Sequence, residues 1–132
     1  LHAALPISYV REIHAMGAAV RLHVCGDVRS ILAEMGTVGA DIVDLDSMVP
    51  VSMARELTGP GQLLAGNVDP VRIVKNGTPE TVRELLAVCF AGAAGGPYAV
   101  NAGCEIPRRT PAENILAMRD FAREQRLVGA RR

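Results

Sequence analysis

The chain has 132 residues, enough for one domain, and 49% of them are apolar, which is ample for a core. Its 14 basic and 14 acidic residues cancel, so the sequence excludes a strong electrostatic attraction to nucleic acid or to an anionic membrane. No apolar run approaches the roughly 20 residues that a membrane-spanning helix needs.

A leader and one helix are expected in residues 1–18. Ser8 is the expected N-cap of this helix, and Gly17 is its expected stop. The chain begins with Leu1 rather than methionine, so we expect an upstream part to be missing. We also expect the opening residues, 1–8, not to be native to the fold.

Four strand patterns follow, and each one is succeeded by a helical pattern. The expected strands cover residues 19–24, 41–46, 62–66 and 97–102. The expected helices cover residues 27–36, 50–58, 78–90 and 110–121, with a basic tail at 127–132. Alternating strands and helices predict an α/β fold with a parallel sheet.

Four such units make half of an eight-stranded barrel, which takes about 250 residues when complete. An open doubly wound sheet is the alternative. Polar side chains follow the C-terminal ends of all four strands, which is the face where barrels of this type build active sites. The sequence therefore favours a TIM-type (β/α)8 barrel, of which residues 19–126 are the last four βα units and the chain a fragment.

Three residues at strand ends are candidate metal ligands. His23 and Cys25 are two residues apart, so they share one face of the first strand, and Cys104 follows the fourth. One imidazole nitrogen and two thiolate sulfurs suit zinc and leave a fourth position for chemistry. The alternative is a half-buried histidine with small core cysteines, which is how we interpret Cys89 in the helix at 78–90. Three cysteines, an odd number, indicate a reducing cytoplasm.

Four more polar residues at strand ends admit two interpretations each. Asp46 is a candidate fourth, oxygen ligand of the metal, or else it faces solvent or caps the next helix. Asn67 and Asp69 are candidates for hydrogen bonding to a substrate, or else ordinary turn residues. Glu105 is either a residue that supports the metal ligands or a solvated loop residue.

Five motifs in order resemble the C-terminal half of the uroporphyrinogen decarboxylase family, and more narrowly its methylcobalamin:coenzyme M methyltransferase branch. They read HVCGD at 23–27, GADIVDLD at 39–46, GNVDP at 66–70, NAGCEIP at 101–107 and TPAENI at 110–115. The porphyrinogen decarboxylases of this family carry Gly-His-Gly where this chain has Gly103-Cys104-Glu105, and they lack the paired histidine and cysteine.

The resemblance implies a zinc site on His23, Cys25 and Cys104. Some relatives have an acidic fourth ligand, which would correspond to Asp46 in this chain. The implied reaction moves a methyl group from methylcobalamin, carried by a partner corrinoid protein, to a small thiol that zinc activates. Two alternatives stay open: a uroporphyrinogen decarboxylase that works without metal, and a non-catalytic half-barrel stabilised by zinc. The other expected partner is the missing N-terminal half-barrel or, because a half-barrel has two open sheet edges, a second copy of the chain.

Overall fold

The computed structural model describes residues 4–129, and within them four strands form one parallel sheet in the order β1-β2-β3-β4. The strands are β1 (Arg21–His23), β2 (Ile42–Asp44), β3 (Leu63–Val68) and β4 (Tyr98–Ala102). Strand order follows chain order, so every connection between neighbours crosses over one face of the sheet. The expected α/β fold with four parallel strands is confirmed.

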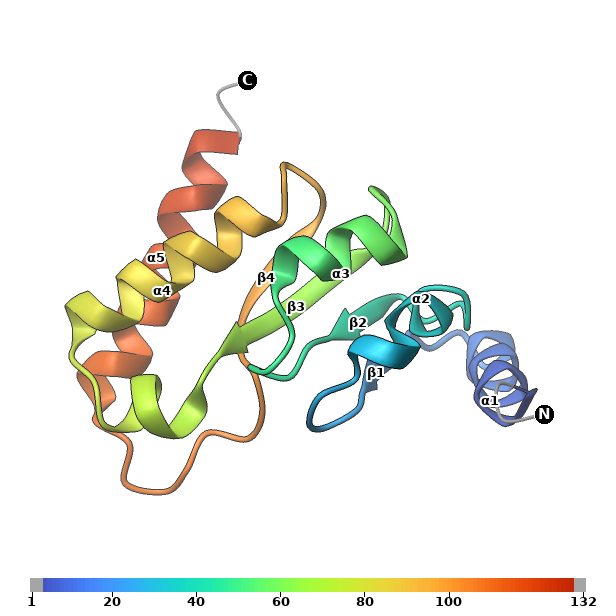
Figure 1. Ribbon diagram of the computed structural model, residues 1–132, viewed down its shortest axis with the longest axis horizontal. Helices are drawn as coiled ribbons and strands as arrows, with labels where there is room; N and C mark the ends of the chain where they lie inside the picture. The colour runs from blue at the N-terminus through green and yellow to red at the C-terminus, as the bar shows by residue number, and fades with distance from the viewer. Residues whose placement is uncertain (1–3, 130–132) are drawn as a thin grey trace.

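Helical segments fill the connections between the strands. They are α1 (Ala4–Ala15), the 3-10 turn η1 (Arg29–Ile31), α2 (Leu32–Met35), α3 (Val51–Thr58), the π-helical turn η2 (Pro70–Lys75), α4 (Pro79–Gly92) and α5 (Ala112–Gly129). Each of α2, α3 and α4 packs against the next helix along the chain. In Figure 1, α1 and α5 lie at opposite ends of the molecule, and α3 and α4 cover β3.

One face of the sheet is covered by these helices. The strand register places Leu22, Val43, Leu64 and Tyr98 in one row, and the middle two are fully buried. The helices α2 and α3 pack their apolar residues on this row, which forms one core cluster. A second cluster lies between β3, β4, α4 and α5, and Cys89 contacts both clusters, as expected of a core residue.

The opposite face of the sheet carries polar side chains. Its central row is His23, Asp44, Ala65 and Ala99. A hollow of about 570 Å³ lies over this face. The two faces therefore have different roles: one holds the core, and the other presents polar groups.

The first helix begins earlier than the sequence indicates. Ser8 was expected to cap it, but α1 starts at Ala4 and includes Ser8. Pro6 is tolerated there because the N–H groups of a first helical turn have no partner within the helix. At the other end, Arg131 and Arg132 of the expected basic tail lie outside the described residues. Across residues 4–129, no helix combines the length and the apolar character that crossing a membrane requires.

Candidate metal centre

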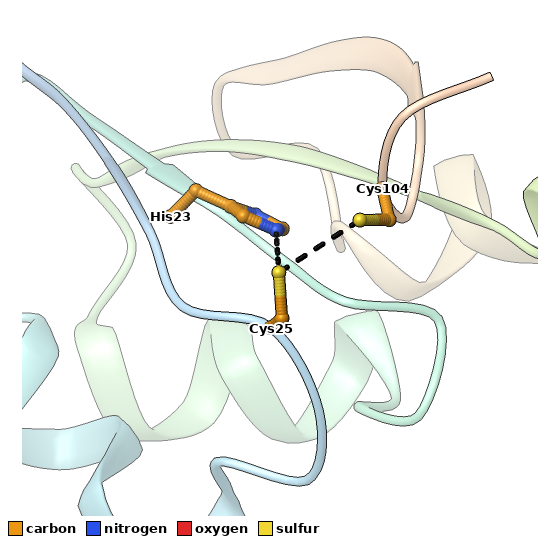
Figure 2. Close-up of side chains that lie close together, drawn as sticks. All are labelled: His23, Cys25 and Cys104. Carbon is orange, nitrogen blue, oxygen red and sulfur yellow. Dashed lines mark hydrogen bonds between the residues drawn. The ribbon is translucent and has the colours of Figure 1, made fainter.

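Three metal-ligand side chains converge at the C-terminal edge of the sheet. His23 is the last residue of β1, Cys25 follows it by two positions, and Cys104 comes two residues after β4. The Nε2 atom of His23 lies 3.2 Å from the sulfur of Cys25, and that sulfur lies 3.8 Å from the sulfur of Cys104. Figure 2 shows the ring of His23 and the thiol of Cys104 both directed at Cys25.

This convergence requires a curved sheet. β1 and β4 are the two outer strands, and three strand spacings would separate them by about 14 Å in a flat sheet. The Nδ2 atom of Asn101 on β4 nevertheless donates to Oδ1 of Asp44, two strands away, over 3.1 Å. The polar face is thus concave, and its curvature draws the two outer strand ends together.

The spacing of the three ligand atoms fits zinc. All three lie within 4.8 Å of one another. Two zinc–sulfur bonds of about 2.3 Å at the tetrahedral angle place their sulfurs about 3.8 Å apart, and a nitrogen and a sulfur about 3.6 Å apart. The observed distances of 3.8 Å between the sulfurs and 3.2 Å between Nε2 and Sγ are close to these values. One nitrogen and two sulfurs are also a common zinc donor set.

The thiols of Cys25 and Cys104 interact directly with each other. The hydrogen bond with Cys104, and then the negative charge that Cys104 would carry, raise the pKa of the Cys25 thiol above its ordinary value. Both cysteines are exposed and free. A bound cation favours the thiolate, so metal binding has to release the protons of these thiols.

The other ring nitrogen of His23 faces Asp44. Its Nδ1 atom lies 3.1 Å from the backbone oxygen of Asp44 and 3.1 Å from Oδ2 of its carboxylate. The same Oδ2 accepts hydrogen bonds from Nε of Arg21 at 3.0 Å and from Nη2 at 2.7 Å. This network was not expected from the sequence. It could have been found only from the register of β1 and β2. In that register Asp44 pairs with His23, and Arg21 lies on the same face of β1 as His23.

Asp46 lies near the cysteines but is occupied by backbone hydrogen bonds. Its Oδ2 accepts from the N–H of Gly26 at 2.8 Å, and its Oδ1 accepts from the N–H of Met48 at 3.0 Å. Burial alone would raise the pKa of this carboxyl, but the hydrogen bonds from Gly26, Met48 and Ser47 together lower it. Its role as a fourth ligand stays a prediction, and the structure adds a second role, which is to brace the loop after Cys25.

The two residues predicted to bind substrate have structural partners. Asn67 is buried, its Nδ2 donates to the backbone oxygens of Asp46 and Val49, and its Oδ1 accepts from the thiol of Cys89. Asp69 caps η2, where its Oδ1 accepts from the N–H groups at 71 and 72. Substrate binding by either residue stays a prediction.

Glu105 lines the hollow over the polar face. The same hollow is lined by Arg21, His23, Asp44, Asn101, Cys104 and Ile106. Glu105 is exposed, directly after Cys104 in the chain. It therefore lies at the rim of the candidate metal centre, and its supporting role stays a prediction.

The chain is similar to proteins of known family. The family described as "Uroporphyrinogen decarboxylase (URO-D)" matches residues 5–125. Methylcobamide:CoM methyltransferase MtbA of Methanosarcina mazei is 31% identical over 119 residues, which are 89% of this chain and 33% of the relative. A uroporphyrinogen decarboxylase of Frankia casuarinae is 35% identical over 89 residues, 66% of this chain and 23% of the relative.

A solved structure shows the same fold. It is described as a methyltransferase from Methanosarcina mazei and superposes with a TM-score of 0.80 at 22% identity, covering 93% of this chain and 35% of that one. The chain thus spans about a third of the length of the methyltransferase relatives.

Proposed function

The chain belongs to the uroporphyrinogen decarboxylase family, and from that premise we propose that it carries the zinc site of a methyltransferase. The reaction moves a methyl group from a methylcorrinoid to a zinc-activated thiol. The observation that carries the proposal is the convergence of His23, Cys25 and Cys104 at one point. The similarity to a methylcobamide:CoM methyltransferase supports the same reaction class.

In this proposal His23, Cys25 and Cys104 hold the ion through one nitrogen and two sulfurs. Zinc bound there would supply an open position for a substrate thiol and a positive charge that lowers the pKa of that thiol. The cysteines bind as thiolates and give their protons to solvent. The substrate sulfur, having lost its proton, forms a bond to the methyl carbon. The carbon–cobalt bond breaks, and its electron pair stays on the corrinoid.

The proposal also concerns the rest of the protein. Residues 19–126 are the last four units of a (β/α)8 barrel, after a leader and helix in residues 1–18 and before a basic tail at 127–132. The concave polar face becomes the barrel interior when an N-terminal half-barrel pairs with the open edges of β1 and β4. A partner corrinoid protein presents its methyl group over the edge that carries Cys25 and Cys104. Two free thiols in the site suit a reducing cytoplasm.

Metal content of the purified chain tests this proposal, with Cys104→Ser as the variant and Cys89→Ser as its control. We expect about one zinc per chain in the wild type and in Cys89→Ser, and a greatly weakened site in Cys104→Ser. The Cys89 thiol donates to Asn67 outside the cluster, so its hydroxyl replacement keeps that bond. A folded chain without zinc would overturn the site and favour the metal-free decarboxylase.

Replacing zinc with cobalt(II), whose absorption spectrum reports its ligands, distinguishes two proposals: an enzyme with an open metal site and a non-catalytic half-barrel that zinc stabilises. An open fourth position binds an added thiol such as coenzyme M, and the sulfur-to-cobalt absorption increases. A site closed by a fourth protein ligand leaves the spectrum unchanged. Methyl transfer from free methylcobalamin to the thiol would then establish the reaction itself.

A further inference from the structure

Asp44 is the polar centre of the concave face, and neither the fold nor the proposed ligand set assigns it a role. We propose that Asp44 is a positioning residue, which binds the Nδ1 side of the His23 ring so that Nε2 faces the two thiols with its lone pair free. This inference rests on the proposed zinc site but not on methyl transfer.

The carboxylate of Asp44 is fixed by three donor atoms of two neighbouring side chains. The side chain is only 6% exposed. Nε and Nη2 of Arg21 donate to its Oδ2, and Nδ2 of Asn101 donates to its Oδ1. These donors come from β1 and β4, so they hold the carboxylate at the middle of the curved sheet. A carboxylate held in this way has little freedom to turn away from His23.

The ring of His23 has different partners on its two nitrogens. Nδ1 lies 3.1 Å from both the backbone oxygen and Oδ2 of Asp44, and both of these atoms only accept hydrogen bonds. An imidazole nitrogen placed between two acceptors must carry the proton. Nε2, at 3.2 Å from the sulfur of Cys25, is then the nitrogen with the free lone pair. The geometry therefore selects the one tautomer that can bind a metal beside the cysteines.

The carboxylate adds something that the backbone oxygen cannot supply. Histidine ligands whose second nitrogen donates to a carboxylate are held in orientation and become stronger bases. Arg21 is half-exposed and donates to the same Oδ2 atom that faces Nδ1 of His23, and it is not one of the three candidate ligands. A plain ion pair between Arg21 and Asp44 would not require His23 to lie between the carboxylate and the thiols.

The test compares Asp44→Asn with Asp41→Asn, which removes an exposed carboxylate directly before the strand that Asp44 ends. Asp41 contacts His14 and the N–H of Val20, away from the ligands. Zinc dissociation constants are measured by competition with a chelator. We expect affinity to fall about 10- to 100-fold in Asp44→Asn and to stay within about twofold of the wild type in Asp41→Asn. Equal affinities in all three proteins would overturn the inference.

A second measurement needs neither metal nor activity. Long-range proton–nitrogen NMR spectra of the metal-free wild type, in mildly alkaline buffer, report which ring nitrogen of His23 carries the proton. We expect the proton on Nδ1 in the wild type and a mixture of tautomers in Asp44→Asn. A proton on Nε2 in the wild type would overturn the inference even if Asp44→Asn failed to fold. A protein that binds zinc but transfers no methyl group would contradict the proposed function and leave this inference standing.

Discussion

The backbone N–H of Gly26 donates a hydrogen bond of 2.8 Å to Oδ2 of Asp46. This bond joins the loop after β1, which carries Cys25, to the loop after β2. Gly26 has a φ of 90°, a conformation that residues with a side chain rarely adopt, so the loop turns sharply just after the ligand. The position of the Cys25 sulfur therefore depends on a carboxylate from the neighbouring strand, even before any metal binds.

Replacing Asp46 with asparagine is expected to destabilise the metal-free chain. The carboxylate accepts backbone hydrogen bonds from Gly26 and Met48, and an amide keeps only one oxygen for the two donors. We expect the free energy of unfolding to fall by about 1.5–3 kcal/mol, the usual effect of losing a hydrogen bond to a charged group. Urea titration in the presence of a chelator measures it.

The matched control is Glu105→Gln, which removes a carboxylate from an exposed residue at the rim of the same centre. We expect its unfolding free energy to stay within about 0.5 kcal/mol of the wild type. If Asp46→Asn matched the wild type without metal and lost stability only with zinc, Asp46 would act as a ligand alone, and the bracing role would be wrong.

The three cysteines are expected to separate by reactivity toward iodoacetamide. The pKa of the Cys25 thiol is raised by its hydrogen bond with Cys104, and burial raises that of Cys89, so exposure sets the order of reaction. Cys25 and Cys104 are exposed, whereas Cys89 is half-buried. In the metal-free chain we expect the first two to be alkylated first. Saturating zinc should slow both of them by about tenfold or more, because thiolates bound to a metal are poor targets.

Mass spectrometry of the labelled peptides gives the rate at each cysteine. Cys89 is the internal control, since its sulfur donates to Asn67 and is outside the ligand cluster. Equal protection of all three cysteines would mean that zinc acts by stabilising the whole fold. Protection of neither Cys25 nor Cys104 would contradict the proposed site.

The sequence predicted that the three candidate ligands lie together, because parallel strands end on one edge. Alternating apolar and polar residues reveal the strands in the sequence, and these strands end at or just before His23, Cys25 and Cys104. The C-terminal ends of parallel strands share one edge of the sheet. The short distance between Cys25 and Cys104 could not be predicted in this way. β1 and β4 are separated by two strands, and only the curvature of the sheet brings Cys25 to within 3.8 Å of Cys104.

Asn67 and Asp44 show what the alternating pattern misses. By alternation Asn67 shares the face of Ala65, but its side chain donates to the backbone of Val49 and accepts from Cys89 on α4, the helix-covered side. The local backbone at Gly66, with a φ of 134°, departs from the regular strand, and one-dimensional periodicity cannot show this. The partners of Asp44 could not be predicted for another reason: they lie on other strands, so they become visible only with the register.

Arg55 is expected to be a major determinant of stability although it lies far from the candidate metal centre in the chain. Its side chain is buried, and burial lowers the pKa of its guanidinium. It donates to five backbone oxygens that end α3 and flank β3 and β4, those of Gly59, Pro60, Gln62, Ala93 and Pro97. Arg55→Met removes one donor from each of these carbonyls, although the oxygens of Ala93 and Pro97 still accept from the N–H groups of Gly96 and Leu64. We expect a loss of about 2–4 kcal/mol in unfolding free energy.

Equilibrium urea unfolding measures this loss, with Arg119→Met as the control. Arg119 is about half-exposed and pairs only with its neighbour Asp120 among the described contacts, so we expect a change within about 0.5 kcal/mol. Gly96 offers an independent check, because a methyl group at this position would meet the guanidinium carbon of Arg55 at 2.6 Å. Wild-type stability in both Arg55→Met and Gly96→Ala would contradict this account.

The acid sensitivity of the fold is expected to depend in part on Asp41. The N–H of Val20 donates to Oδ2 of Asp41 at 2.6 Å, and Nε2 of His14 lies 2.8 Å from the same oxygen, so this carboxylate joins α1 to the start of the sheet. The hydrogen bond from Val20 is the main reason why the pKa of Asp41 is lower than its ordinary value of 3.8, and His14 adds to it.

A lowered pKa in the folded state means that the unfolded chain binds more protons as the solution becomes acidic. The stabilisation by Asp41 is therefore complete above the ordinary value of 3.8 and is lost as the pH falls through the lower folded value. We expect Asp41→Asn to be less stable than the wild type at neutral pH and to approach it in acid, once the pH is below the lowered folded pKa of Asp41. Urea midpoints at the two pH values test this, with the exposed Glu56→Gln as control. A gap that stays constant or widens in acid would show that the carboxylate does not stabilise the fold through its charge.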